Sequence, residues 1–169
     1  MRNTAAFRYF VYSMEILLIF VLLGTPLLLP DIFGGAPCVL MASATTIAVF
    51  ESEVPAMVFG MVCGVLIDLG FSNSIGTFAI SLTIVCFILG FVANNYITAN
   101  FWNVMLSSIV IITAVMSIHF LFSYVIEGYG EASLYFINHY ISRIVLTVLT
   151  TAAIYFFNRF IYRTLSDEF

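Results

Sequence analysis

Three ionisable side chains lie inside long apolar stretches of this sequence: Asp68, His119 and Arg143. An ionisable group in such a stretch is costly unless it is paired, hydrated or neutral, so it is a functional candidate with a partner. We therefore expect Asp68 and Arg143 to form an ion pair, with His119 nearby in the same polar cluster. In the alternative, Asp68 and Arg143 each reach water or headgroups separately, and His119 makes an ordinary interhelical hydrogen bond.

The densest motif precedes Asp68 on the same apolar stretch. Gly60, Gly64 and Asp68 are spaced four residues apart, so they fall on one stripe of a helix. Two small residues at this spacing let a second helix approach closely. The stripe predicts a helix-packing or partner interface, and Asp68 adds a polar contact to it. Gly76 follows the next loop, where we expect it to serve loop geometry or close packing.

A further set of polar residues occurs near the N-terminus. Arg8, Tyr12 and Glu15 share one face of a helix. A bridge between Arg8 and Glu15 would help the carboxylate enter the edge of an apolar layer. The alternative places both side chains in water without contact.

The sequence lacks the residue patterns that several kinds of chemistry require. No Ser-His-Asp arrangement, no metal-spaced cluster of His, Cys and Glu and no glycine-rich phosphate loop is found. We therefore expect no enzymatic activity, no cofactor and no metal site. The three cysteines lie in apolar segments, and their odd number gives no disulfide framework, so we expect them to be packing residues: Cys38, Cys63 and Cys86.

The amino-acid composition indicates that the chain lies in a membrane. Of 169 residues, 63% are apolar and 8% are charged, whereas about 25% of an ordinary soluble domain is charged. A soluble domain of this size could not bury so much apolar surface. The net charge of −4 leaves no basic patch for nucleic acid. We predict an integral membrane protein in contact with lipid.

The apolar segments are continuous rather than alternating, which favours helices over a barrel. We expect an all-α bundle of about six transmembrane helices that forms one domain over residues 1–169. The second segment is short, so we expect it to be tilted or partly re-entrant. The predicted spans are 9–29, 36–50, 54–70, 75–93, 101–125 and 140–161.

Arginine placement predicts the orientation of the bundle. With six spans both termini face the same side, and four of the five arginines then fall there. That side should be cytoplasmic, so the long 126–138 loop and the predicted polar cluster face outward. The four arginines are Arg2, Arg8, Arg159 and Arg163.

The stretch from Pro37 to Asn94 resembles the family of the rod shape-determining protein MreD. That family has a proline that opens the second span, a G-x-x-x-G-x-x-x-D-L core, a short polar loop and an Ile-Gly or Leu-Gly pair that opens the next helix. Val65 stands where the family has a leucine. The chain length, the six spans and the basic end of the last helix also agree. The matching residues here are Pro37, Gly60, Gly64, Asp68, Leu69, Ser72, Asn73, Ser74, Ile75 and Gly76.

The resemblance implies a non-enzymatic scaffold in the bacterial plasma membrane. Its partner would be an MreC-like bitopic protein. The same assembly would include the actin-like MreB, the glycosyltransferase RodA and a class B penicillin-binding protein. Side-wall peptidoglycan synthesis and rod shape depend on that assembly. Exposed apolar helix faces would receive the single helix of the partner.

A second resemblance belongs to another class of protein. The substrate-binding components of energy-coupling-factor transporters have similar size and hydropathy, and some carry a G-x-x-x-G-x-x-x-D stretch. They bind a vitamin or similar ligand in an outward pocket, which Asp68, His119 and Arg143 would line. The first span has bulky residues over 16–23 in place of an Ala-x-x-x-Ala coupling stripe. A neighbouring gene for an MreC-like protein, or for a pair of ATPases, would distinguish the two.

Overall fold

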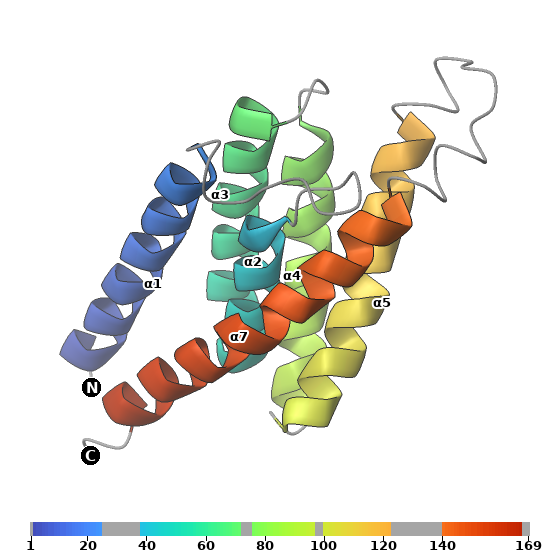
Figure 1. Ribbon diagram of the computed structural model, residues 1–169. Coiled ribbons are helices and arrows are strands. Elements are labelled where there is room, and N and C mark those ends of the chain that lie inside the picture. The colour runs from blue at the N-terminus through green and yellow to red at the C-terminus, as the bar shows by residue number, and fades with distance from the viewer. Residues whose placement is uncertain (1, 25–37, 72–75, 97–99, 123–139, 167–169) are drawn as a thin grey trace.

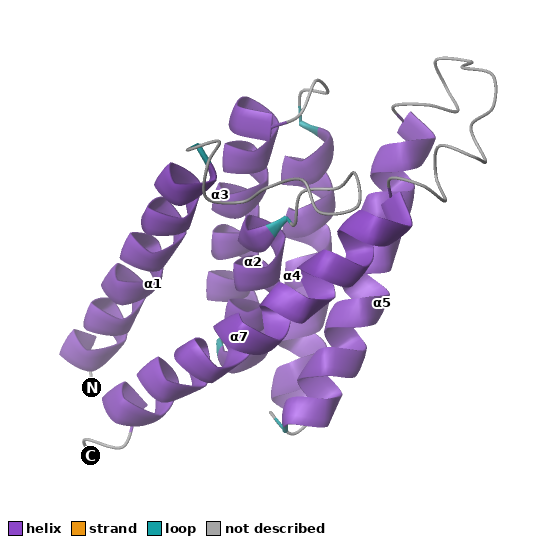
Figure 2. Cartoon of the chain, in the orientation of Figure 1, coloured by secondary structure: helices purple, strands orange, loops and turns teal. Residues whose placement is uncertain are grey.

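The computed structural model describes residues 2–24, 38–71, 76–96, 100–122 and 140–166. Every regular element in these ranges is a helix, as Figure 2 shows. Five of the helices are long and apolar enough to cross a membrane, which confirms the predicted all-α, multi-pass membrane architecture. The helices are α1 (Arg2–Leu23), α2 (Val39–Phe50), α3 (Glu53–Phe71), α4 (Thr77–Asn95), α5 (Phe101–Phe120) and α7 (Ile141–Ser166).

The predicted segments match these helices in order, with shifted ends. Helix α1 begins at Arg2 rather than at residue 9, and α7 continues to Ser166 rather than ending at 161. Residues 25–29, 36–37, 75 and 123–125 of four predicted spans lie outside the described residues, as does the whole 126–138 loop. Terminal charged residues are therefore part of the helices, which a count of apolar residues alone does not reveal.

Both chain ends lie at the same end of the bundle (Figure 1). Helix α1 forms one edge, α5 forms the other, and α7 crosses the bundle diagonally between them. This agrees with the predicted placement of both termini on one side. That this side is cytoplasmic stays a prediction.

The short helix α2 is the centre of the bundle, since it packs against each of the other five helices. Its 12 residues span about 18 Å, less than the roughly 30 Å of a hydrocarbon core. All ten residues from Leu40 to Val49 are buried. Many are small, which lets the surrounding helices approach closely.

Buried polar groups of α2 are satisfied locally. The hydroxyl of Ser43 donates to the carbonyl of Leu40 at 2.9 Å, and that of Thr45 donates to the carbonyl of Ala42 at 3.0 Å. At the start of the helix, the backbone N–H of Cys38 donates to Oγ1 of Thr147 on α7 at 3.0 Å. A helix that begins inside a bundle needs such partners for its first amides, and α7 supplies this one.

The three cysteines are all buried and free. The structure therefore confirms their predicted role as packing residues in the core.

Candidate functional site

The glycine stripe of α3 packs against α4 of the same chain. A Cβ atom added at Gly60 would lie 2.7 Å from Cβ of Cys86. One added at Gly64 would lie 2.5 Å from Cα of Ala79. Real Cβ atoms do not approach other atoms this closely, so only glycine fits where these two helices cross. The stripe is an internal packing surface, and α4 occupies it.

Asp68 completes the same contact by capping helix α4. Its Oδ2 accepts a hydrogen bond from the backbone N–H of Ala79 at 2.9 Å, and its Oδ1 accepts one from Phe78 at 3.2 Å. The residue at the N-cap position of α4 is Gly76, which has no side chain to offer. A carboxylate from α3 therefore does the work of an N-cap, satisfying two free amides and facing the positive end of the helix dipole.

Gly76 is required by the backbone of this junction. Its φ of +89° lies in the left-handed region, and no atom would lie within 4 Å of an added Cβ. Conformation, rather than space, therefore favours glycine here. Gly60, Gly64, Asp68 and Gly76 together hold α3 and α4 in close contact, and this helix pair is hereafter the glycine hairpin.

The predicted ion pair between Asp68 and Arg143 is absent from the described part of the chain. Both carboxylate oxygens of Asp68 instead accept hydrogen bonds from backbone amides at the start of α4. Nε of Arg143 is buried and has no hydrogen-bond partner among the described residues. The three predicted residues nevertheless share one region, since His119 interacts electrostatically with both Asp68 and Arg143.

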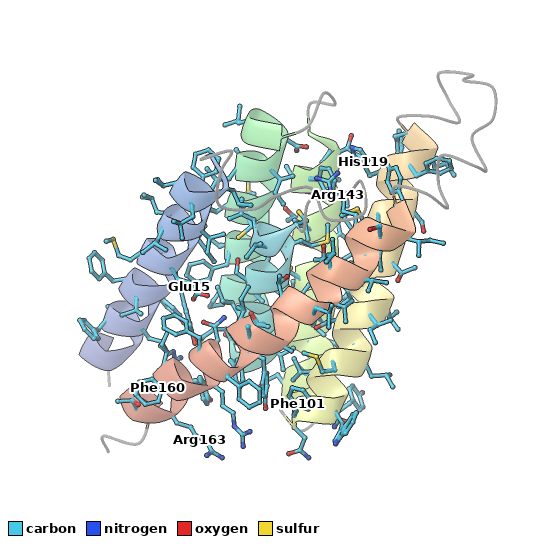
Figure 3. All side chains as sticks on the ribbon, in the orientation of Figure 1. Glu15, Phe101, His119, Arg143, Phe160 and Arg163 are labelled. Carbon is cyan, nitrogen blue, oxygen red and sulfur yellow. The ribbon has the colours of Figure 1, made fainter. Side chains whose placement is uncertain are left out.

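His119 is held by neighbours on both sides. Its Nδ1 lies 2.9 Å from the hydroxyl of Tyr140, and its ring stacks on Phe78 with centroids 4.4 Å apart. These contacts join α5 to α4 and to the residue that precedes α7. The alternative prediction for His119, an ordinary hydrogen bond between helical segments, is therefore confirmed by its contact with Tyr140. Figure 3 shows His119 and Arg143 near the end of the bundle opposite the termini.

A second polar site, near the chain ends, escaped the sequence analysis. The guanidinium of Arg8 on α1 contacts the carboxylate of Glu51 through two atom pairs, Nε–Oε1 at 2.5 Å and Nη2–Oε2 at 2.9 Å. The Glu51 side chain is only 2% exposed. The guanidinium also lies over the ring of Tyr162, 5.0 Å from its centroid. This site, hereafter the inner ion pair, ties α1 to α2 and α7.

The structure shows neither alternative considered for Arg8 and Glu15, because Arg8 pairs with Glu51 instead. Arg8 and Glu15 are seven positions apart, which places them about 10 Å apart along the helix axis, whereas Glu51 ends α2 at the level of Arg8. Burial raises the pKa of the Glu51 carboxyl above its ordinary value, and the Arg8 guanidinium opposes that shift. The acidic stretch 51–53 on the arginine-rich side was the available signal for this contact.

Three hollows are lined by residues of the described ranges. One of about 390 Å³ lies beside the inner ion pair and includes Asn94 and Tyr162. A largely apolar groove of about 460 Å³ lies between α4 and α5. A larger apolar groove of about 600 Å³ separates α1 from α3. Its lining residues are Tyr9, Ser13, Ile16, Leu17, Phe20, Val54, Pro55, Val58, Phe59, Val62 and Leu66.

The arrangement is suited to holding helices together and to offering apolar surfaces. Within the ranges that the structure describes, no group of three or more His, Cys, Asp or Glu side chains could hold a metal ion. No family model, curated protein or solved structure matches the chain.

Proposed function

We propose that the chain is a non-enzymatic membrane scaffold of the MreD type in the bacterial plasma membrane. It would bind an MreC-like bitopic protein and support side-wall peptidoglycan synthesis and rod shape, in an assembly with MreB, RodA and a class B penicillin-binding protein. The glycine hairpin carries the proposal. Of the residues that underlie the resemblance to MreD, Gly60, Gly64, Asp68 and Gly76 act together in packing α3 against α4. Pro37 and residues 72–75 lie outside the described part of the chain.

A scaffold needs a fixed body and a free apolar surface. The glycine hairpin and the buried helix α2 supply the fixed body. Helix α1 supplies a free surface, because Phe10, Leu17 and Leu18 are each more than half exposed. Helices associate in lipid through close packing of such faces. The groove between α1 and α3 is the position that we assign to the partner's single helix.

Co-purification from native membranes tests the proposal. The chain is tagged at its C-terminus, solubilised gently, and its partners are identified by mass spectrometry. Recovery of an MreC-like protein supports the scaffold function. Recovery of a coupling subunit with ATPases overturns it in favour of a transporter component.

A matched pair of variants makes the result specific. Val62→Trp fills the groove between α1 and α3, whereas Ile84→Trp adds the same bulk to an exposed position of α4 outside that groove. We expect Val62→Trp to reduce recovery of the partner and Ile84→Trp to leave it unchanged. Equal recovery with both variants would move the partner to another face.

The transporter alternative draws less support from the site. Its outward pocket would need Asp68 and His119 to contact a ligand. Both oxygens of Asp68 serve α4, and His119 is engaged by Tyr140 and Phe78. These residues are therefore occupied in holding helices together.

A further inference from the structure

A polar hollow and an apolar groove meet at Tyr9, near the end of the bundle where both chain ends lie (Figure 1). This residue lines both the hollow of about 390 Å³ beside the inner ion pair and the groove of about 600 Å³ between α1 and α3. Residues 51–52 line the hollow, and residues 54–55 line the groove. Each volume lies within the range of about 300–1,000 Å³ that ligand sites occupy. Together they form one site with a polar end and an apolar end.

The polar hollow lies at the edge of the apolar layer. Three of the residues that line it, Arg8, Asn94 and Tyr162, lie within two positions of the end of an apolar span. Phospholipid headgroups occupy this level of a membrane, outside the hydrocarbon core. The hollow is therefore at the depth of a headgroup. The spans are Ala6–Leu23 on α1, Thr77–Asn95 on α4 and Ile141–Thr164 on α7.

The apolar groove has the length of one leaflet. Its lining on α1 runs from Tyr9 to Phe20, and these positions are about 16 Å apart along the helix axis. Half of a hydrocarbon core of about 30 Å is about 15 Å. The groove therefore begins at the level of the headgroups and ends near the middle of the membrane, as a single acyl chain does.

The side chains around the hollow fit a headgroup that carries both signs of charge. Arg8 and Glu51 are the charged side chains that line it within the described ranges. Their mutual contacts use two of the five N–H groups of the guanidinium, so others can donate to a phosphate. The exposed side chains of Ser52 and Asn94 add oxygen acceptors. An anionic headgroup would bring a second negative charge to Glu51, whereas a headgroup with an ammonium group would not.

We propose that the hollow and the groove bind one molecule of phosphatidylethanolamine. The phosphate accepts hydrogen bonds from Arg8. The ammonium group donates to the side-chain oxygens of Ser52 and Asn94, and the Glu51 carboxylate favours its positive charge. One acyl chain lies in the groove and fills the space that separates α1 from α3. The partner's helix that we assign to this groove would displace the acyl chain, so the lipid site belongs to the chain without its partner.

A competition between lipids tests the headgroup assignment. The full chain is expressed alone and purified in detergent. It is then mixed with equal amounts of phosphatidylethanolamine, phosphatidylcholine and phosphatidylglycerol that have identical acyl chains. Native mass spectrometry measures which lipid is retained. We expect about a tenfold preference for phosphatidylethanolamine, because the choline headgroup has no ammonium N–H and the glycerol headgroup has no positive charge.

A matched pair of variants tests the contact with the ammonium group. Asn94→Ala removes an amide that lines the hollow, whereas Asn95→Ala removes the next amide along the helix, which donates to the carbonyl of Phe91. Loss of a neutral hydrogen bond should reduce retention of phosphatidylethanolamine by about threefold in Asn94→Ala. Asn95→Ala should retain the lipid as the wild type does.

A photoreactive phosphatidylethanolamine locates the acyl chain. The lipid carries a diazirine on one acyl chain, and mass spectrometry identifies the labelled peptides. In the wild-type chain we expect labels within residues 9–20 and 54–66, which contain the lining of the groove. Val58→Trp fills the groove and should remove most of this labelling. Ile84→Trp adds the same bulk at an exposed position of α4 outside the groove and should leave the labelling unchanged.

Three results would overturn the proposal. Equal retention of the three lipids would show that the hollow does not recognise a headgroup. Preferential retention of phosphatidylglycerol would show that an ammonium group is not required. Labels on the exposed face of α5 in place of the groove would put the acyl chain elsewhere. Since each measurement uses the chain without a partner, these results do not bear on the scaffold function, and failure to recover a partner would not bear on lipid binding.

Discussion

The glycine hairpin and helix α1 show two ways of attaching a helix inside a membrane. In the hairpin, α3 and α4 approach so closely that an added methyl group at Gly64 would meet the backbone of α4. Helix α1 instead meets the bundle through long side chains, above all the ion pair of Arg8 with Glu51. Lipid is as apolar as the helices, so close packing and polar contacts are the available forces. The glycine hairpin relies mainly on close packing, and α1 relies mainly on polar contacts.

This difference has a consequence for rigidity. Close packing depends on many small contacts that must be lost together. A polar contact depends on two groups, so one substitution can release it. We therefore expect the hairpin to be permanent and α1 to be adjustable, and four predictions test that contrast.

The largest effect should follow from filling the hairpin. Gly64→Leu places a side chain where Ala79 has its Cα atom, 2.5 Å from an added Cβ. Overpacking of this kind costs about 1–3 kcal/mol or more, and here the obstacle is backbone. We expect a large fall in the thermal unfolding midpoint in detergent. Val65→Leu, one residue along on the partly exposed side, is the control and should change the midpoint little.

The cap on α4 comes next. Asp68→Ala leaves the amides of Phe78 and Ala79 without an acceptor, and loss of an N-cap costs about 0.5–2 kcal/mol. Asp68→Asn keeps one acceptor oxygen and should cost less. Arg143→Gln is the comparison variant, and its effect on the unfolding midpoint is compared with that of the Asp68 variants. If the effects of Asp68→Asn and Arg143→Gln on the unfolding midpoint were not additive, the two residues would be coupled, which would favour the originally predicted ion pair.

A smaller effect is expected at the inner ion pair. Hydrogen bonds to charged groups contribute about 1.5–3 kcal/mol, and partial exposure of Arg8 reduces that figure. A double-mutant cycle of Arg8→Gln and Glu51→Gln should give a coupling energy of about 1 kcal/mol. The two substitutions should also make α1 easier to cleave by protease while the glycine hairpin stays intact. Zero coupling would mean that α1 is held by its apolar contacts alone.

The smallest effect on stability should come from the outer face of α1. Leu18 is 59% exposed, and exposed substitutions usually change stability by less than about 0.5 kcal/mol. Leu18→Ala should therefore leave the unfolding midpoint of the isolated chain unchanged. A clear fall in that midpoint would show that α1 packs more extensively than its exposure indicates.

The same contrast explains what the sequence could predict. Gly60, Gly64 and Asp68 could be identified because helical spacing alone places them on one stripe. The apolar segments and their order could be identified because their lengths match a membrane. Both signals are local and repeat with a known period.

The missed features depend on contacts between distant parts of the chain. Thr46 and Asn158, which are joined by a hydrogen bond, are 112 positions apart, and Arg8 and Glu51 are 43 positions apart. No periodicity within one helix can pair them. The central place of α2 was missed for the same reason, although its run of small and hydroxyl-bearing residues is the composition that a helix surrounded on all sides requires.

The position of α2 also constrains how the protein is made. Its segment is too short to span the membrane by itself, and its first amide is bonded to Thr147, which is synthesised 109 residues after Cys38. The ribosome therefore delivers the centre of the bundle long before its wall exists. Until α7 has entered the membrane, the start of α2 must rely on another hydrogen-bonding partner, such as water, the insertion machinery or a temporary neighbour. Assembly of this protein thus ends, rather than begins, with its core.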